Sequence, residues 1–254
     1  MLESSDLLLF FLTLASAFIG VNFGGTMLLI MPMLLGLGYS PLLALSATRP
    51  AVISQSLVGM RLFRQYSELN RKEWLVLFLS AAAGGCIGVY ALSQLNPTQS
   101  IIIMSALLVS LCILAVIRQV WTKRSEPPEN TFSKSSGSFT YMLVGFSPAI
   151  IGGLVGAGGG PLVVFLSWLL LKKGLKQNAY LEKVVSLGHS IAVCIWLILM
   201  GQFDLKVSLL LLLAATLGAW LGAKVTLKLN VYWMYGIIIL VSLGVLIKRI
   251  FLVS

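Results

Sequence analysis

The stretch GGLVGAGGGPLVV, residues 152–164, places six glycines and one proline among thirteen positions inside an otherwise apolar run. In a helix interior, glycine is less favourable than alanine by about 1 kcal/mol and proline by about 3 kcal/mol. Irregular backbone is tolerated at membrane depth only where it is buried in protein or lines a watery cavity. The stretch therefore predicts a broken helix that borders a cavity or a close helix contact.

The composition around this stretch is that of an integral membrane protein. Of the 254 residues, 58% are hydrophobic and 10% are charged, and the mean hydropathy is +0.98. Ordinary soluble domains are about 25% charged, and apolar segments of about 20 residues span a bilayer as helices. We expect an all-α, multi-pass protein of the cell membrane. The first apolar segment follows Glu3 and Asp6 with no basic residue, so it is interpreted as a retained membrane helix rather than a secretory signal.

Charge, cysteine and motif content exclude several other functions. The formal charge is +10, but the basic residues lie mostly in short connections, where membrane orientation explains them, and no nucleic-acid partner is expected. Cys86, Cys112 and Cys194 occur singly inside apolar segments, so neither a disulfide nor a metal site is indicated. No GxxxxGK[ST] motif is present. We expect no cofactor, and as partners only a small anionic solute and membrane lipid; the oligomeric state stays open.

Eight apolar segments follow one another, at residues 7–35, 41–60, 74–92, 99–120, 139–171, 180–200, 205–225 and 231–251. The first and fifth are too long for one straight span and contain glycine clusters, so each is expected to consist of two half-helices joined by a break. The polar residues 121–138 form a linker. The chain therefore divides into two four-helix halves, residues 1–120 and 139–254.

The two halves carry traces of a duplication. An offset of 134 residues lays Gly158 and Gly159 on the glycine pair at 24 and 25, and Lys183 on Arg49. With an even number of segments in each half, we expect parallel repeats related by an axis along the membrane normal. The distribution of Lys and Arg then favours a cytoplasmic location for both termini, on the same side as the connection that follows the second segment.

The glycine breaks are candidate anion sites. A half-helix that begins at a break presents unpaired N–H groups and the positive end of its dipole, which together bind anions. Pro161 suits the first turn of such a half-helix, because its missing N–H is not needed there. The alternative is a seam of small residues for helix packing, and packing is the preferred interpretation of Gly84, Gly88, Gly218 and Gly222.

Arg49 lies near the middle of the second apolar segment, where inserting an arginine costs about 2.5–3.5 kcal/mol. It therefore needs a partner or a ligand, and a planar guanidinium offers paired donors that suit carboxylate, sulfonate or sulfite oxygens. The alternative is that the segment boundary is misdrawn and Arg49 lies at the membrane interface.

Other polar residues are candidates for the same site. Lys183 either binds substrate or extends to water, and Glu182 is either its partner or a proton-coupling carboxylate. His189 is a hydrogen-bonded core histidine, a substrate donor or a proton carrier, and the offset pairs it with Gln55. The serines that complete such a site, or that only join helices, are Ser54, Ser56, Ser186 and Ser190.

The two glycine-rich breaks carry a family resemblance. The first half reads GVNFGGTMLLIMPMLL at residues 20–35 and the second GAGGGPLVVFLSWLL at residues 156–170. Together they resemble the TauE/SafE family of sulfite and organosulfonate exporters, also grouped as 4-toluene sulfonate uptake permeases. The resemblance implies a carrier for small anions, often sulfur-containing oxyanions. It points to residues at the breaks, namely Gly24, Gly25, Gly158, Gly159, Gly160 and Pro161. The first half departs from the family pattern, since only two glycines follow Asn22 and Phe23.

The main hypothesis is a secondary transporter that works by alternating access, with the two breaks near the bilayer midplane and Arg49 supplying charge. The first alternative is an anion channel, which would pass anions without saturation. The second is an intramembrane enzyme that pairs His189 with Ser186 or Ser190. No GxSxG motif supports it, and no enzymatic activity is expected.

Overall fold

The computed structural model describes residues 4–21, 26–122, 137–156, 159–173 and 175–225, and these residues form helices and short connections without any strand. The all-α prediction is therefore confirmed for this part of the chain. The expected eighth segment, residues 231–251, lies outside the described residues. The helices are α1 (Ser4–Gly20), α2 (Thr26–Gly36), α3 (Pro41–Phe63), η1 (Arg64–Tyr66), α4 (Arg71–Ser93), α5 (Pro97–Thr122), α6 (Ser138–Val155), α7 (Gly159–Leu171), α8 (Leu175–Leu199) and α9 (Leu205–Val225).

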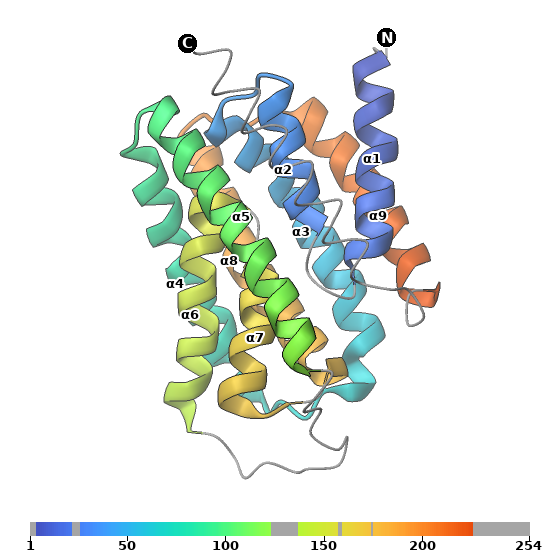
Figure 1. Cartoon of the computed structure of the whole chain (residues 1–254), viewed down its shortest axis with the longest axis vertical. Coiled ribbons are helices and arrows are strands. Elements are labelled where there is room, and N and C mark those ends of the chain that lie inside the picture. The colour runs from blue at the N-terminus through green and yellow to red at the C-terminus, as the bar shows by residue number, and fades with distance from the viewer. Residues whose placement is uncertain (1–3, 22–25, 123–136, 157–158, 174, 226–254) are drawn as a thin grey trace.

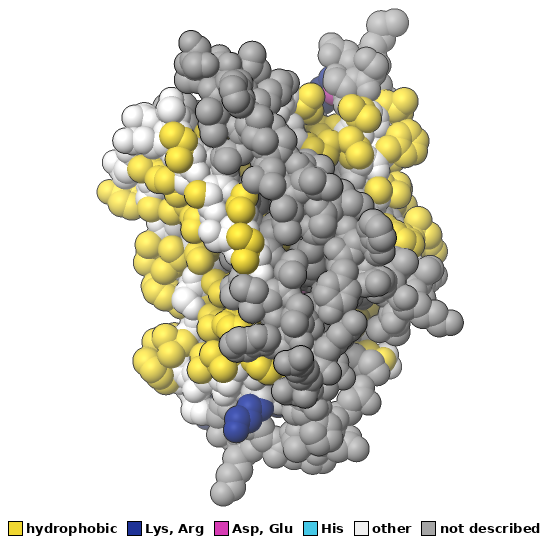
Figure 2. Space-filling model, viewed as in Figure 1, with side chains coloured by type: hydrophobic (Ala, Val, Ile, Leu, Met, Phe, Trp, Pro, Cys, Tyr) yellow, Lys and Arg dark blue, Asp and Glu magenta, His cyan; other side chains and the backbone are white. Residues whose placement is uncertain are grey.

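The helices have the lengths and surfaces of membrane segments. Four stretches are long and apolar enough to cross a bilayer, namely Arg71–Ser93, Ser138–Val155, Gln177–Leu199 and Leu205–Gly222. Shorter apolar helices lie in α1, α2, α5 and α7. Hydrophobic side chains cover much of the described surface along the sides of the molecule (Figure 2). An apolar surface of this kind is what lipid contact requires.

The glycine-rich stretch of residues 152–164 is a helix break. α6 ends at Val155, and the next residue, Gly156, has a positive φ of 76° and donates its N–H to the carbonyl of Gly152 at 2.9 Å. Glycine adopts this left-handed conformation at a helix end without steric cost. α7 begins at Gly159, so Pro161 lies in its first turn as expected.

The half-helices fold back on each other instead of continuing in one direction. A Cβ added to Gly159 would lie 3.2 Å from the carbonyl oxygen of Pro148, which places the start of α7 alongside the body of α6. Figure 1 shows α7 returning beside α6, and α2 returning in the same way beside α1. Each pair is therefore a helical hairpin, which returns the chain to the side from which it entered.

Because of these hairpins, the expected parallel arrangement of the two halves is wrong. α3 and α8 are antiparallel: Gly59, late in α3, contacts Lys183, early in α8, whereas Arg49 contacts His189 further along α8. The ion pair between Glu68 and Lys173, at 3.0 Å, joins the connection after α3 to the connection before α8.

A second ion pair joins the opposite end of the molecule. Asp6 at the start of α1 pairs with Lys206 at the start of α9, at 2.8 Å. Figure 1 shows the start of α1 at the upper end, while the connection between α3 and α4 lies at the lower end. The start of the described chain and the connection after α3 therefore lie at opposite ends, contrary to the sequence-based expectation that they share one side.

The glycines assigned to packing do lie at close helix contacts. A Cβ on Gly84 or Gly88 of α4 would meet backbone carbonyl oxygens of α6, and one on Gly218 or Gly222 of α9 would meet carbonyl oxygens of α1. Small residues let membrane helices approach to backbone contact. The packing interpretation of these four glycines is confirmed.

Candidate functional site

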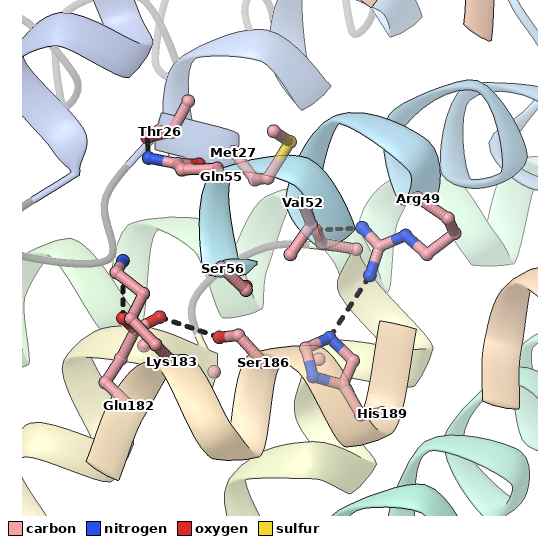
Figure 3. Close-up of a pocket in the computed structure, with 14 residues that line it drawn as sticks. Thr26, Met27, Arg49, Val52, Gln55, Ser56, Glu182, Lys183, Ser186 and His189 are labelled. Carbon is pink, nitrogen blue, oxygen red and sulfur yellow. Dashed lines mark hydrogen bonds and ion pairs between the residues drawn. The ribbon is translucent and has the colours of Figure 1, made fainter. Parts of the chain in front are cut away.

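A pocket lies where α3, α8 and the starts of α2 and α7 converge (Figure 3). It encloses about 390 Å³ of space not filled by atoms, including the part open to the outside. Its lining is formed by Thr26, Met27, Arg49, Val52, Gln55, Ser56, Gly152, Gly156, Gly159, Gly160, Glu182, Lys183, Ser186 and His189. The lining is rich in polar groups although the surrounding protein is apolar, which is typical of a solute site inside a membrane protein.

Arg49 is fully buried, with 0% of its surface exposed, so its side chain does not extend to water. Its Nη2 donates to the carbonyl oxygen of Gly156 at 2.6 Å and to Thr48 Oγ1 at 3.0 Å. Its Nε donates to the carbonyl oxygen of Leu45 at 3.2 Å, and its Nη1 lies 3.2 Å from His189 Nε2. Arg49 therefore connects α3 to the break after α6 and to α8.

The partners of Arg49 are all uncharged. Among the described residues, no carboxylate forms an ion pair with it. A guanidinium carries five N–H donors, and four of them are accounted for by the neutral acceptors in the described part of the chain. Burying a cation without a counter-ion is costly. The arrangement therefore favours an anion near Arg49, which would compensate its charge and accept the remaining donor.

The ring of His189 is held in one orientation by both of its nitrogens. Nδ1 lies 3.1 Å from the carbonyl oxygen of Val185, and Nε2 faces Arg49. Because arginine only donates, Nε2 accepts the hydrogen bond, and Nδ1 carries the proton and donates it to the Val185 carbonyl. The ring lies on Gly152, where a Cβ would be 3.0 Å from Nε2.

Glu182 and Lys183 form a buried ion pair at the other side of the pocket. Lys183 Nζ lies 2.6 Å from Glu182 Oε2, and the two residues are 2% and 4% exposed. Ser186 Oγ donates to Glu182 Oε1 at 2.7 Å. The alkyl chain of Lys183 lies against Gly59, where a Cβ would be 2.8 Å from Cε. The alternative that Lys183 extends to water is wrong.

Both hairpins reach the pocket. Gln55 Nε2 donates to Thr26 Oγ1 at 2.6 Å, and Thr26 is the first residue of α2. Gly159 and Gly160 are the first residues of α7. The N-termini of two half-helices therefore border the same space, and each presents N–H groups that have no partner within its own helix.

The structure brings most of the residues singled out in the sequence to this pocket. Those that line it are Arg49, Gln55, Ser56, Gly159, Gly160, Glu182, Lys183, Ser186 and His189. Gly24, Gly25 and Gly158 lie outside the described residues. Ser54 and Ser190 are not in the lining, although Ser190 Oγ lies 3.4 Å from His189 Nε2.

Sequence reasoning missed five members of the lining, namely Thr26, Met27, Val52, Gly152 and Gly156. Thr26 had a usable signal, because it is the first polar residue after the glycine pair at 24 and 25 and so was placed to begin a half-helix. Among the described residues, no group of histidine, cysteine and acidic side chains is arranged to hold a metal ion.

Comparison with known proteins gives one match. The family model described as sulfite exporter TauE/SafE matches residues 8–249, which is nearly the whole chain. No curated protein and no solved structure matches the chain significantly.

Proposed function

The chain belongs to the TauE/SafE family of sulfite exporters, and from this premise we propose that it carries a small sulfur-containing oxyanion, such as sulfite or a sulfonate, by alternating access. The observation that carries the proposal is Arg49, a fully buried cation whose described partners are all neutral and which borders the central pocket. The proposal is for a secondary transporter rather than an enzyme.

In this proposal the anion lies between the Arg49 guanidinium and the start of α7. The N–H groups of Gly159 and Gly160, which have no partner within α7, and the positive end of the α7 dipole favour negative charge at that point. Lys183 supplies a second cation from the other side of the pocket. Gln55 and His189 complete the polar lining.

We further propose that the chain consists of two inverted repeats, residues 1–120 and 139–254, joined by the linker 121–138. The contacts between helices support this, because they recur with the halves exchanged. α4 packs on α6 as α9 packs on α1, and α4 packs on α8 as α9 packs on α3. The glycines at the first pair of contacts, Gly84 with Gly88 and Gly218 with Gly222, are related by the offset of 134 residues. Inverted repeats that exchange conformations are the usual basis of alternating access.

The basic residues favour one orientation of this arrangement. The end that holds the Glu68–Lys173 pair exposes Arg61, Arg64, Arg71, Lys72 and Lys172. At the opposite end, Lys206 pairs with Asp6, and Asp204 lies close by in sequence. By the positive-inside rule, the first end faces the cytoplasm and the start of α1 faces outward. This replaces the expectation of a cytoplasmic N-terminus; the C-terminus lies outside the described residues.

Cysteine labelling tests the orientation. Gln65 in η1 and Gln94 after α4 are both exposed and lie at opposite ends of α4. In a background without the native cysteines, we expect Gln94→Cys to react with a membrane-impermeant maleimide on intact cells and Gln65→Cys to react only after permeabilisation. The reverse pattern would contradict the orientation.

Substitutions at Gly152 and Gly153 distinguish an effect on the pocket from an effect on helix packing. We expect Gly152→Ala to displace the His189 ring from Arg49 and to slow sulfite exchange about 10-fold, with little change in stability. Gly153→Ala, by contrast, pushes on the backbone carbonyl of Gly85, and it should lower the melting temperature. Exchange rates and thermal unfolding of both variants are measured side by side. Equal effects of the two substitutions on both readouts would contradict a positioning role for Gly152.

The function itself is tested by sulfite exchange in proteoliposomes that contain the purified chain. A carrier gives saturable exchange that is faster than net flux, whereas a channel gives flux that follows voltage without saturation. Two buried titratable side chains in the pocket, Glu182 and His189, are the candidates for coupling such a flux to protons.

A further inference from the structure

We propose that Glu182 is the proton site of the carrier and that movement of Lys183 away from Glu182 causes the carboxylate to bind a proton. On anion binding, the Lys183 ammonium leaves the Glu182 carboxylate and pairs with the anion, and Glu182 takes up a proton. One proton therefore moves with each anion. This inference rests on the proposed transport function and names the coupling ion and its site.

The geometry of the pair fits an exchange of partners. The ammonium of Lys183 has three donors, and the carboxylate oxygen of Glu182 is its only charged acceptor among the described residues. Glu182 and Lys183 both line the pocket. Glu182 and Ser186 lie on successive turns of α8, and their side chains are hydrogen-bonded (Figure 3). An anion entering the pocket therefore meets an ammonium that can reorient on a flexible four-carbon chain.

His189 is less suited to carry the proton. Its Nε2 accepts from Arg49 and its Nδ1 donates to the Val185 carbonyl, so both nitrogens are occupied. A second proton on the ring would place a donor against the guanidinium, which has no acceptor to offer. Glu182, in contrast, keeps its hydrogen bond from Ser186 Oγ when the other oxygen is protonated.

The charges that face Glu182 are few. In the pocket, α3 contributes Arg49 and α8 contributes Lys183 and His189, whereas α2, α6 and α7 contribute only uncharged residues. The charged residues of α4, Arg71, Lys72 and Glu73, lie in its first turn, and those of the neighbouring η1 segment are exposed. Tyr141 of α6 lies among the apolar residues around Leu77 and Val144. The net charge of the pocket therefore depends on Arg49, Lys183 and Glu182.

The exchange of partners also explains why Glu182 would take up a proton. The empty pocket holds Arg49 and Lys183 against Glu182, which gives one net positive charge. If the Lys183 ammonium pairs with a monovalent anion, an ionised Glu182 loses its partner and lies beside a second negative charge. In an apolar environment this arrangement is strongly unfavourable. Protonation of Glu182 removes this conflict.

Glu182→Gln tests the inference, because it keeps the shape of the side chain and one of its two acceptor oxygens but cannot bind the proton. Labelled sulfite exchange at equal pH and sulfite uptake with an internal pH dye are measured in the same proteoliposomes. We expect the variant to retain exchange within about 10-fold and to carry one proton fewer per sulfite than the wild type. Titration of sulfite itself is common to both proteins and cancels in this difference. Glu68→Gln, which removes a carboxylate outside the pocket, should leave the proton ratio unchanged.

The outcomes separate this inference from the transport function. Absence of saturable exchange in the wild type would overturn the transport proposal. Exchange with equal proton ratios in the wild type and Glu182→Gln would leave transport intact and overturn the proton site. Loss of exchange in Glu182→Gln would assign the carboxylate to structure and overturn the coupling role, because the amide has the same charge as the protonated carboxyl of the loaded carrier.

Discussion

Replacing Arg49 by alanine is expected to lower saturable sulfite exchange by about 100-fold or more. Truncating one member of a buried charge pair costs about 2–5 kcal/mol, and each 1.4 kcal/mol is a factor of ten. In this chain the anion itself would be the missing member, because the acceptors around the guanidinium are neutral. The effect is measured as the initial rate of labelled sulfite exchange at limiting substrate concentration, normalised to the amount of inserted protein.

A lysine at the same position distinguishes charge from geometry. Arg49→Lys keeps the positive charge but loses the planar group that reaches both Gly156 and His189, so we expect an intermediate loss of about 10-fold. Size-exclusion profiles and melting temperatures of both variants control for folding, because Arg49 also holds the end of α6. Exchange at the wild-type rate in folded Arg49→Ala would contradict the assignment of the anion site.

The positions of the helices could be predicted from the sequence because apolar length and glycine content determine them locally. The described helices begin and end within a few residues of the first seven predicted segments, and both long segments are interrupted near their glycine clusters. The direction taken after a break could not be predicted in this way. A straight broken helix and a hairpin expose the same apolar residues to lipid, and only contacts such as Gly159 with Pro148 distinguish them.

The polar residues of the pocket were predictable as a set, because an ionisable side chain inside an apolar segment needs a partner. The pairing of Lys183 with Glu182 was one of the two alternatives that the sequence left open, and the structure shows this ion pair. Glu182 and Lys183 are adjacent in sequence, and adjacent residues do not face each other on a helix. In the structure Gly59 leaves room for the alkyl chain of Lys183, whose Nζ reaches Glu182. That room depends on the antiparallel packing of α3 and α8, which hydropathy does not encode.

Gly88→Ala and Gly222→Ala are expected to destabilise the protein by similar amounts. A Cβ on Gly88 would overlap the carbonyl oxygen of Ile150 in α6, and one on Gly222 would overlap that of Phe18 in α1. Neither carbonyl can move without shifting its helix. Overpacking of this kind costs about 1–3 kcal/mol, which for a chain of this size lowers the melting temperature by about 2–12 °C. Thermal unfolding in detergent, followed by tryptophan fluorescence, measures the change.

Gly137→Ala is the matched control, because the Cβ there meets nothing within 4 Å and the φ of −59° suits any residue. Its melting temperature should stay close to that of the wild type. The similarity of the two destabilised variants is the informative result, since Gly88 and Gly222 lie in different halves and share only the offset of 134 residues. Contacts that recur by duplication should respond alike, because each substitution forces apart an equivalent pair of helices, one from each half. A large loss at one position with none at the other would contradict the inverted repeat.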